Sequence, residues 1–134
     1  MTTPFDGRIL LWHWQGAAVV EATVAELAAA VRAQTPNVSG VAVKSSNGQD
    51  WQGQRDAKAS MAVTGPEALI RWVKELQDCE LETHLWCVVH GRDPEAEAAR
   101  IVTACGVPGV RSMILDVEAG EGYFGSQPLE RVKA

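Results

Sequence analysis

Residues 110–118 read VRSMILDVE, an apolar run that ends in two carboxylates. Met113 to Val117 is apolar apart from Asp116, which is typical of a strand covered on both faces. Because side chains alternate along a strand, Asp116 and Glu118 share one face, roughly 6.6 Å apart along the backbone. Two carboxylates at such a separation can divide acid and base roles. A turn acid followed by a solvated glutamate is the alternative interpretation.

Three apolar stretches upstream are also predicted to be strands: residues 8–14 (RILLWHW), 38–44 (VSGVAVK) and 81–90 (LETHLWCVVH). Helical patterns separate them at residues 24–34, from Pro66 onward and at residues 94–105, and a last helical turn or two is expected at 128–134. Strands that alternate with helices form parallel sheets with right-handed crossovers. The predicted fold is therefore α/β, as a single domain over residues 1–134. It is either a (βα)4 half of a TIM barrel or a four-stranded doubly wound open sheet.

Local signals mark where two of the helices begin. Thr23 and Glu26 have the spacing of a capping box, and Asp93-Pro94 supplies an acidic cap followed by proline at the first helical position. Between the second strand and the second helix lies a polar segment, residues 45–65. A segment of this length inside a compact domain is usually functional, and it is expected to contain a short helix around residues 54–61.

Apolar spacing predicts which helical residues face the core. The inward stripe of the second helix is expected to be Leu69, Ile70, Val73 and Leu76. That of the third helix is expected to be Ala98, Ile101, Val102 and Cys105. The cysteines are odd in number and set in apolar surroundings, so Cys79, Cys87 and Cys105 are predicted to be buried thiols in a reducing compartment.

The composition excludes several classes of function. The chain carries 12 Lys and Arg against 17 Asp and Glu, a net charge of −5, which argues against a nucleic-acid or membrane-surface partner. No apolar run approaches the roughly 20 residues of a membrane span. The N-terminal MTTPFDGR lacks the basic and apolar regions of a signal peptide, so a cytoplasmic location is expected, with use by a phage or another export route left open. No zinc-like or phosphate-binding motif is present, so neither a metal nor a cofactor is expected.

Polar and aromatic residues gather where the predicted strands end, which is the active edge of both candidate architectures. The candidate substrate-binding residues are Trp14, Lys44, Asn47, Trp51, Trp86, His90 and Tyr123, and the candidate catalytic residues are Asp116 and Glu118. Each has a structural alternative: the tryptophans as core residues, and Lys44 as an ion-pair partner of the carboxylates. His13 lies on the opposite face of its strand from Trp14 and is expected to be structural.

The residues that carry a family resemblance lie along nearly the whole chain. They are LWHW at 11–14, VAVK at 41–44, NGQDW at 47–51, Trp86, GRDPEAEA at 91–98 and LDVE at 115–118. Together they resemble the first half of a glycoside-hydrolase-type (β/α)8 barrel. The closing Asp-x-Glu is similar to that at the end of the fourth strand in glycoside hydrolase family 25 muramidases and, more distantly, in family 18 chitinase-like barrels. The stretch after the second strand is similar to that of uncharacterised bacterial and phage barrels of this type.

This resemblance implies roles for the two carboxylates. Glu118 would be the general acid, and Asp116 would orient the substrate or stabilise the developing charge on an amino-sugar polymer. The chain departs from the family at the end of the first strand, where His13 and Trp14 stand in place of an acid. Strands five to eight are also absent.

Four strands make about half of a barrel, since a whole one needs about 250 residues. A half-barrel exposes two unpaired edges and an apolar interior. We therefore expect that a second copy completes it as a homodimer around a two-fold axis, or that the chain is part of a longer protein.

Two other classes of function remain open. The chain could be a non-catalytic assembly or carbohydrate-binding module, with Trp14, Trp51 and Trp86 as stacking surfaces and the carboxylates as partners of Lys44. It could also be a doubly wound domain that binds another ligand.

Overall fold

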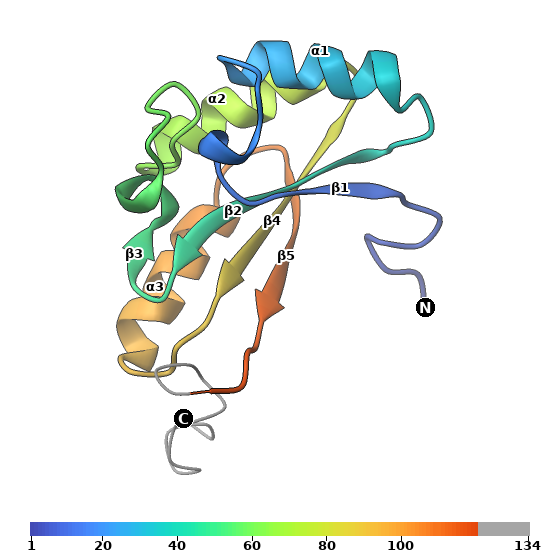
Figure 1. Cartoon of the computed structure of the whole chain (residues 1–134). Coiled ribbons are helices and arrows are strands. Elements are labelled where there is room, and N and C mark those ends of the chain that lie inside the picture. The colour runs from blue at the N-terminus through green and yellow to red at the C-terminus, as the bar shows by residue number, and fades with distance from the viewer. Residues whose placement is uncertain (121–134) are drawn as a thin grey trace.

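The computed structural model describes residues 1–120, and its centre is one sheet (Figure 1). Four strands of this sheet run parallel: β1 (Leu10–His13), β2 (Gly40–Asn47), β4 (Glu82–Val88) and β5 (Val110–Asp116). The short β3 (Asp50–Trp51) pairs antiparallel with the end of β2. The predicted α/β fold with a parallel sheet is thus confirmed. The helix expected at 128–134 lies outside the described residues.

Three α-helices connect the parallel strands: α1 (Val24–Gln34), α2 (Pro66–Gln77) and α3 (Pro94–Cys105). The predicted starts of α1 and α3 are confirmed. Thr23 Oγ1 accepts the N–H of Glu26 at 3.2 Å, and Asp93 Oδ1 accepts the N–H of Ala96 at 3.1 Å. Each bond satisfies a donor that has no partner inside its helix. No helix within residues 1–120 combines the length and the apolar character needed to cross a bilayer.

The strands lie in the order β1-β2-β4-β5, which follows the chain without a reversal. All three helices lie on one side of the sheet, above and to the left of it in Figure 1. The other face, called the open face below, carries no helix from residues 1–120. A doubly wound sheet reverses its strand order and carries helices on both faces. The winding observed here is the one expected for half of a (β/α)8 barrel.

The main core lies between the sheet and the helices. Val41 and Val43 of β2 and Leu85 of β4 contribute to it from the sheet. Trp72 of α2 is the largest fully buried side chain, and its indole N–H donates to the carbonyl of Met61 at 3.0 Å. Full burial of a large apolar side chain contributes on the order of 2–3 kcal/mol. This core fixes which face of each strand is left open.

The inward face of α2 differs in part from the prediction. Leu69, Val73 and Leu76 are buried as expected, but Ile70 is 53% exposed and Trp72 takes an inward position. The prediction from apolar spacing included Ile70 because this residue is apolar and follows Leu69. Its side chain nevertheless lies on the outer side of the helix. An indole at the inward position fills more of the core than the predicted isoleucine.

The predicted stripe of α3 is wrong at three of its four positions, which are exposed: Ala98, Val102 and Cys105. Glu97 and Ala104 are buried instead. The carboxylate of Glu97 accepts, at 2.9–3.2 Å, the backbone N–H groups of His90, Gly91 and Arg92. These bonds tie the first turn of α3 to the loop after β4 and hold the buried carboxylate inward. The hydrogen bonds from the loop to Glu97, and not the spacing of apolar residues, therefore decide which side of α3 faces the sheet.

The cysteines also differ from the prediction. Only Cys87 is buried, while Cys79 is half-buried and Cys105 is exposed, and all three are free thiols. Burial raises the pKa of the Cys87 thiol to about 11. This thiol is therefore protonated at neutral pH and packs as a small apolar group.

The segment after β2 is a hairpin and a short 3-10 helix, η2 (Gln52–Arg55), so the segment contains a short helix as expected, but at residues 52–55 and not at 54–61. Gly48 lies in the two-residue turn between β2 and β3 with φ of 61°, which glycine adopts without strain. The N–H of Gly53 donates to the carbonyl of Val63 at 2.8 Å. A Cβ at Gly53 would lie 2.8 Å from that oxygen, so only glycine permits this approach.

His13, at the end of β1, is buried on the helix side with its ring centroid 4.9 Å from that of Trp72. This placement agrees with the structural role expected for it. Burial lowers the pKa of His13 to about 4, although the negative charge of Asp56 opposes the shift.

We expect the protein to lose stability between pH 7 and pH 5 because of His13. The unfolded chain binds a proton at this residue near pH 6.5, whereas the folded protein leaves it neutral down to about pH 4. Protons therefore favour the unfolded state across this window, by roughly 2 kcal/mol between pH 7 and pH 5. Urea unfolding of the protein and of His13→Gln at both pH values measures the effect. An equally large loss in His13→Gln would contradict the assignment.

Candidate functional site

A pocket of about 440 Å³ lies on the open face of the sheet, at the carboxyl ends of the parallel strands. Its lining comes from all four parallel strands or the residues that follow them, and from η2: Trp12, Trp14, Gln15, Lys44, Asn47, Gln52, Arg55, Trp86, Val88 and Glu118. Ligand sites of parallel α/β folds form at this edge. Five of the residues singled out in the sequence lie together around the pocket: Trp14, Lys44, Asn47, Trp86 and Glu118.

Trp12, Trp14 and Trp86 line the pocket and together are called the aromatic wall below. The ring centroids of Trp12 and Trp86 are 4.6 Å apart, and the indole N–H of Trp86 donates to the carbonyl of His13 at 2.9 Å. Trp86 is buried and held in place by this bond, whereas Trp12 and Trp14 are 51% and 54% exposed. Exposed aromatic surface inside a hollow with polar neighbours is typical of ligand sites.

A β-bulge in β2 brings both Lys44 and Asn47 to the pocket. Lys44 lies opposite Trp86, and the pairing with β4 resumes only at Ser46, so one extra residue is inserted. The hydroxyl of this extra residue, Ser45, donates to the carbonyl of Trp86 at 3.1 Å. Residues three apart on a regular strand face opposite sides, and the bulge corrects this for Asn47. No pattern in the sequence predicts this bulge.

Lys44 is buried, with only 6% of the residue exposed, and its Nζ lies 4.7 Å from the centroid of the Trp86 ring. Within residues 1–120 it makes neither a hydrogen bond nor a salt bridge. Burial lowers the pKa of Lys44, and the charges of Asp116 and Glu118 oppose this shift. The ion pair considered between Lys44 and the carboxylates is thus a longer-range attraction without direct contact. The ammonium group instead makes a cation–π contact with the Trp86 ring.

Five lining residues are absent from the sequence-based set of candidate site residues: Trp12, Gln15, Gln52, Arg55 and Val88. Gln52 is 3% exposed, and its Oε1 is buried with no hydrogen-bond donor among the described residues. A buried amide oxygen without a donor is costly. Arg55 lies 3.3 Å from Asp50. The β2–β3 hairpin places the side chains of Gln52 and Arg55 at the pocket. A glutamine in a polar segment is common, so the sequence gives no sign that Gln52 lines a pocket.

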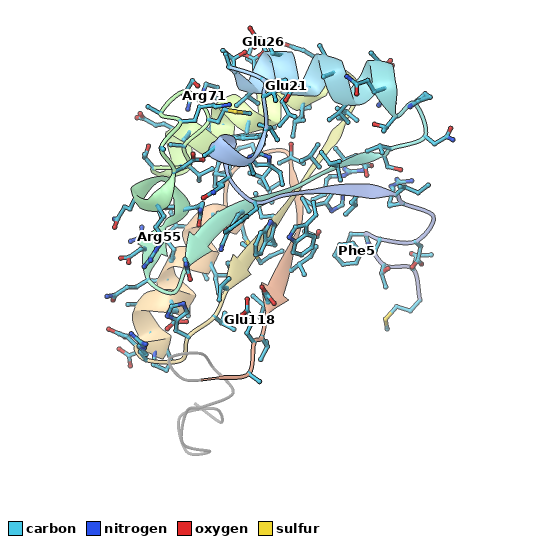
Figure 2. All side chains as sticks on the ribbon, viewed as in Figure 1. Phe5, Glu21, Glu26, Arg55, Arg71 and Glu118 are labelled. Carbon is cyan, nitrogen blue, oxygen red and sulfur yellow. The ribbon has the colours of Figure 1, made fainter. Side chains whose placement is uncertain are left out.

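The two candidate catalytic carboxylates differ in their position relative to the pocket. Asp116 pairs with Val88 on β4, and Glu118 lines the pocket two residues later. Figure 2 shows Glu118 just beyond the end of β5 and Arg55 on the segment that follows β3. Asp116 is half-buried and acts on the pocket through its charge on Lys44. Glu118 therefore lines the pocket directly, whereas Asp116 acts on it only through its charge.

The remaining candidates lie elsewhere. Trp51, a substrate-binding candidate, is buried in the helix-side core with the guanidinium of Arg100 4.5 Å from its ring centroid, which is the core position considered as its alternative. His90 lines a neighbouring hollow of about 210 Å³, and its Nε2 lies 2.7 Å from Oδ1 of Asn47. It therefore positions a lining residue without lining the main pocket. Tyr123 lies outside the described residues.

In the part of the chain that the structure describes, no group of three or more His, Cys, Asp or Glu side chains is placed to hold a metal ion. Comparisons with models of protein families, with curated proteins and with solved structures find no match to this chain. The chemistry of the pocket itself is therefore the basis on which a function can be inferred.

Proposed function

We propose that this chain is a half-barrel relative of the glycoside hydrolases and that its pocket binds a saccharide. The observation that carries the proposal is the wall of Trp12, Trp14 and Trp86 facing a polar set within one pocket. A sugar ring presents a face of C–H groups and a periphery of hydroxyls, and an indole face suits the first of these.

The polar lining suits the periphery of a sugar. Oε1 of Gln52 lacks a donor, and a sugar hydroxyl can supply one. Lys44 offers donors, and so does the amide nitrogen of Asn47, because His90 already engages its Oδ1. Hydroxyls donate and accept, so one ring satisfies these different groups at the same time.

Hydrolysis is a further proposal for the same pocket. Glu118 would protonate the leaving glycosidic oxygen, Asp116 would stabilise positive charge that develops on the sugar ring, and a water molecule would add its hydroxyl to the anomeric carbon. Support comes from their common position at the end of β5 and from the effect of both charges on Lys44. In the alternative, a non-catalytic carbohydrate-binding module, the two carboxylates serve only as counter-charges for Lys44.

We also propose that a second copy of the chain covers the open face. A closed barrel of this type has eight parallel strands, and the described sheet has four. The open face is apolar below the pocket, where Leu10, Ala42 and Ile114 cluster with Trp86. A two-fold axis along the barrel would pair β5 of each copy with β1 of the other, which removes both edges and leaves the pockets at the mouth.

Replacing Trp14 by alanine should weaken saccharide binding about tenfold, because one stacking face is lost, equivalent to about 1.4 kcal/mol. Isothermal titration with N-acetylglucosamine oligomers measures the change. Trp14 is more than half exposed, so the fold should be unaffected. Phe5→Ala is the matched control, since Phe5 packs 5.8 Å from His84 and does not line the pocket. Equal affinity of Trp14→Ala and the parent protein would contradict the proposal.

Glu118→Gln separates binding from hydrolysis. If Glu118 is a general acid, the variant should bind the oligomers and release no reducing ends, while the parent protein releases them. Release by neither protein, with binding intact in both, would leave a carbohydrate-binding module.

Ile114→Lys should convert a dimer into a monomer, because it places a charge within the apolar part of the open face. Light scattering on a sizing column should give twice 14.4 kDa for the parent protein and 14.4 kDa for the variant. Ile70→Lys is the matched control, since Ile70 is exposed on the outer side of α2 and should leave the dimer intact. A parent protein that stays monomeric at every concentration would rule out the paired half-barrel.

A further inference from the structure

The three lysines in residues 1–120 have different surroundings. Lys74 is exposed and lies 2.6 Å from Asp78. Lys58 donates to the carbonyls of Val19 and Glu21 at 2.7 and 2.6 Å. Lys44 is buried, lines the pocket and makes no hydrogen bond or salt bridge within the described residues. Its amine is therefore the one that faces a ligand cavity without being engaged by oxygen acceptors.

A lysine in such a place can act as a nucleophile. Attack needs the neutral amine, and burial lowers the pKa of Lys44, which raises the fraction of that form. The negative charges of Asp116 and Glu118 raise the pKa of Lys44 and so oppose the effect of burial. The positive charge of Arg55 lowers this pKa further. The Trp86 ring, 4.7 Å from Nζ, stabilises a cation at this position and would equally stabilise an iminium ion.

We propose that Lys44 forms a reversible Schiff base with a small carbonyl compound, such as a hydroxyaldehyde or the open-chain form of a sugar, that enters the pocket. Nζ attacks the carbonyl carbon, and the carbonyl oxygen takes a proton to give a carbinolamine. Loss of that hydroxyl with one more proton, as water, leaves a C=N bond to Nζ. The proton that Nζ loses goes to the carbonyl oxygen, so one amine, one carbonyl compound and one further proton give one iminium ion and one water, and no oxidant or reductant is needed.

Glu118 is suited to move these protons. It lines the same pocket as Lys44, and its charge acts on the lysine, so the two groups face one cavity. In the proposed reaction it donates the proton to the departing hydroxyl and then recovers one from water. Gln52 Oε1, which has no donor in the described residues, would accept a hydroxyl of the bound aldehyde. This activity goes beyond saccharide binding, although it uses the same cavity.

Reductive trapping tests the proposal. The full chain is incubated at pH 7 with glycolaldehyde and sodium cyanoborohydride, and peptide mapping by mass spectrometry follows the hydroxyethyl group on each lysine. Lys44 should be labelled faster than Lys74, because burial lowers the pKa of Lys44 and raises its amine fraction, whereas Asp78 raises the pKa of Lys74. Labelling of Lys44 at or below the rate of Lys74 would overturn the proposal.

Matched variants test whether the fast labelling comes from Lys44 itself. Lys44→Met should abolish the fast labelling, and Lys74→Met should leave it unchanged. Glu118→Gln also removes a charge that raises the pKa of Lys44, which by itself would speed labelling, so slower labelling of Lys44 in this variant, with Lys58 and Lys74 unchanged, would identify Glu118 as the proton donor. If Lys44→Met fails to fold, labelling of Lys44 in urea-unfolded parent protein replaces it and should fall to the rate of Lys74.

The two proposals fail in different ways. A methyl glycoside has no free carbonyl, so it reports saccharide binding alone. Binding of methyl glycosides without fast labelling of Lys44 would overturn the Schiff base and keep the saccharide pocket. Fast labelling of Lys44 without saccharide binding would overturn the saccharide pocket and keep the Schiff base.

Discussion

The packing of α1, α2 and α3 against a single face of the sheet is the constraint on which the rest of the structure depends. It buries Val41, Val43 and Leu85 beneath the helices and so directs the alternate side chains of each strand to the open face. Because all the parallel strands end at the same edge, those alternate side chains converge there. The aromatic wall, the buried lysine and the pocket are consequences of that one-sided winding.

Three features with an energetic cost lie at the pocket. Lys44 is buried beside an aromatic ring, Gln52 has an amide oxygen without a donor in the described residues, and Trp14 is more than half exposed. Each of these raises the free energy of the folded chain without a ligand. A bound molecule with an apolar face and several hydroxyls would relieve all three together. This coincidence of unsatisfied groups in one cavity favours a ligand site over a structural cluster.

The sequence predicts the fold well because its signals are local. Alternating apolar strands and capped helices need no tertiary information, and Thr23 and Asp93 begin their helices as expected. Errors arise where distant contacts decide the outcome. Glu97 caps a loop and turns α3, and the hairpin at Gly48 carries Gln52 into the pocket. The bulge that aims Asn47 depends on pairing with β4 and has no pattern along the chain.

The central claim is that a ligand binds on the open face at the carboxyl ends of the strands. The most direct measurement follows the indole N–H signals of the five tryptophans by NMR during titration with a saccharide. The account predicts that the signals of Trp12 and Trp14 move most, and that those of Trp51 and Trp72, buried under the helices, stay in place. Unchanged signals at Trp12 and Trp14 at saturating saccharide, or movement confined to Trp51 and Trp72, would contradict it.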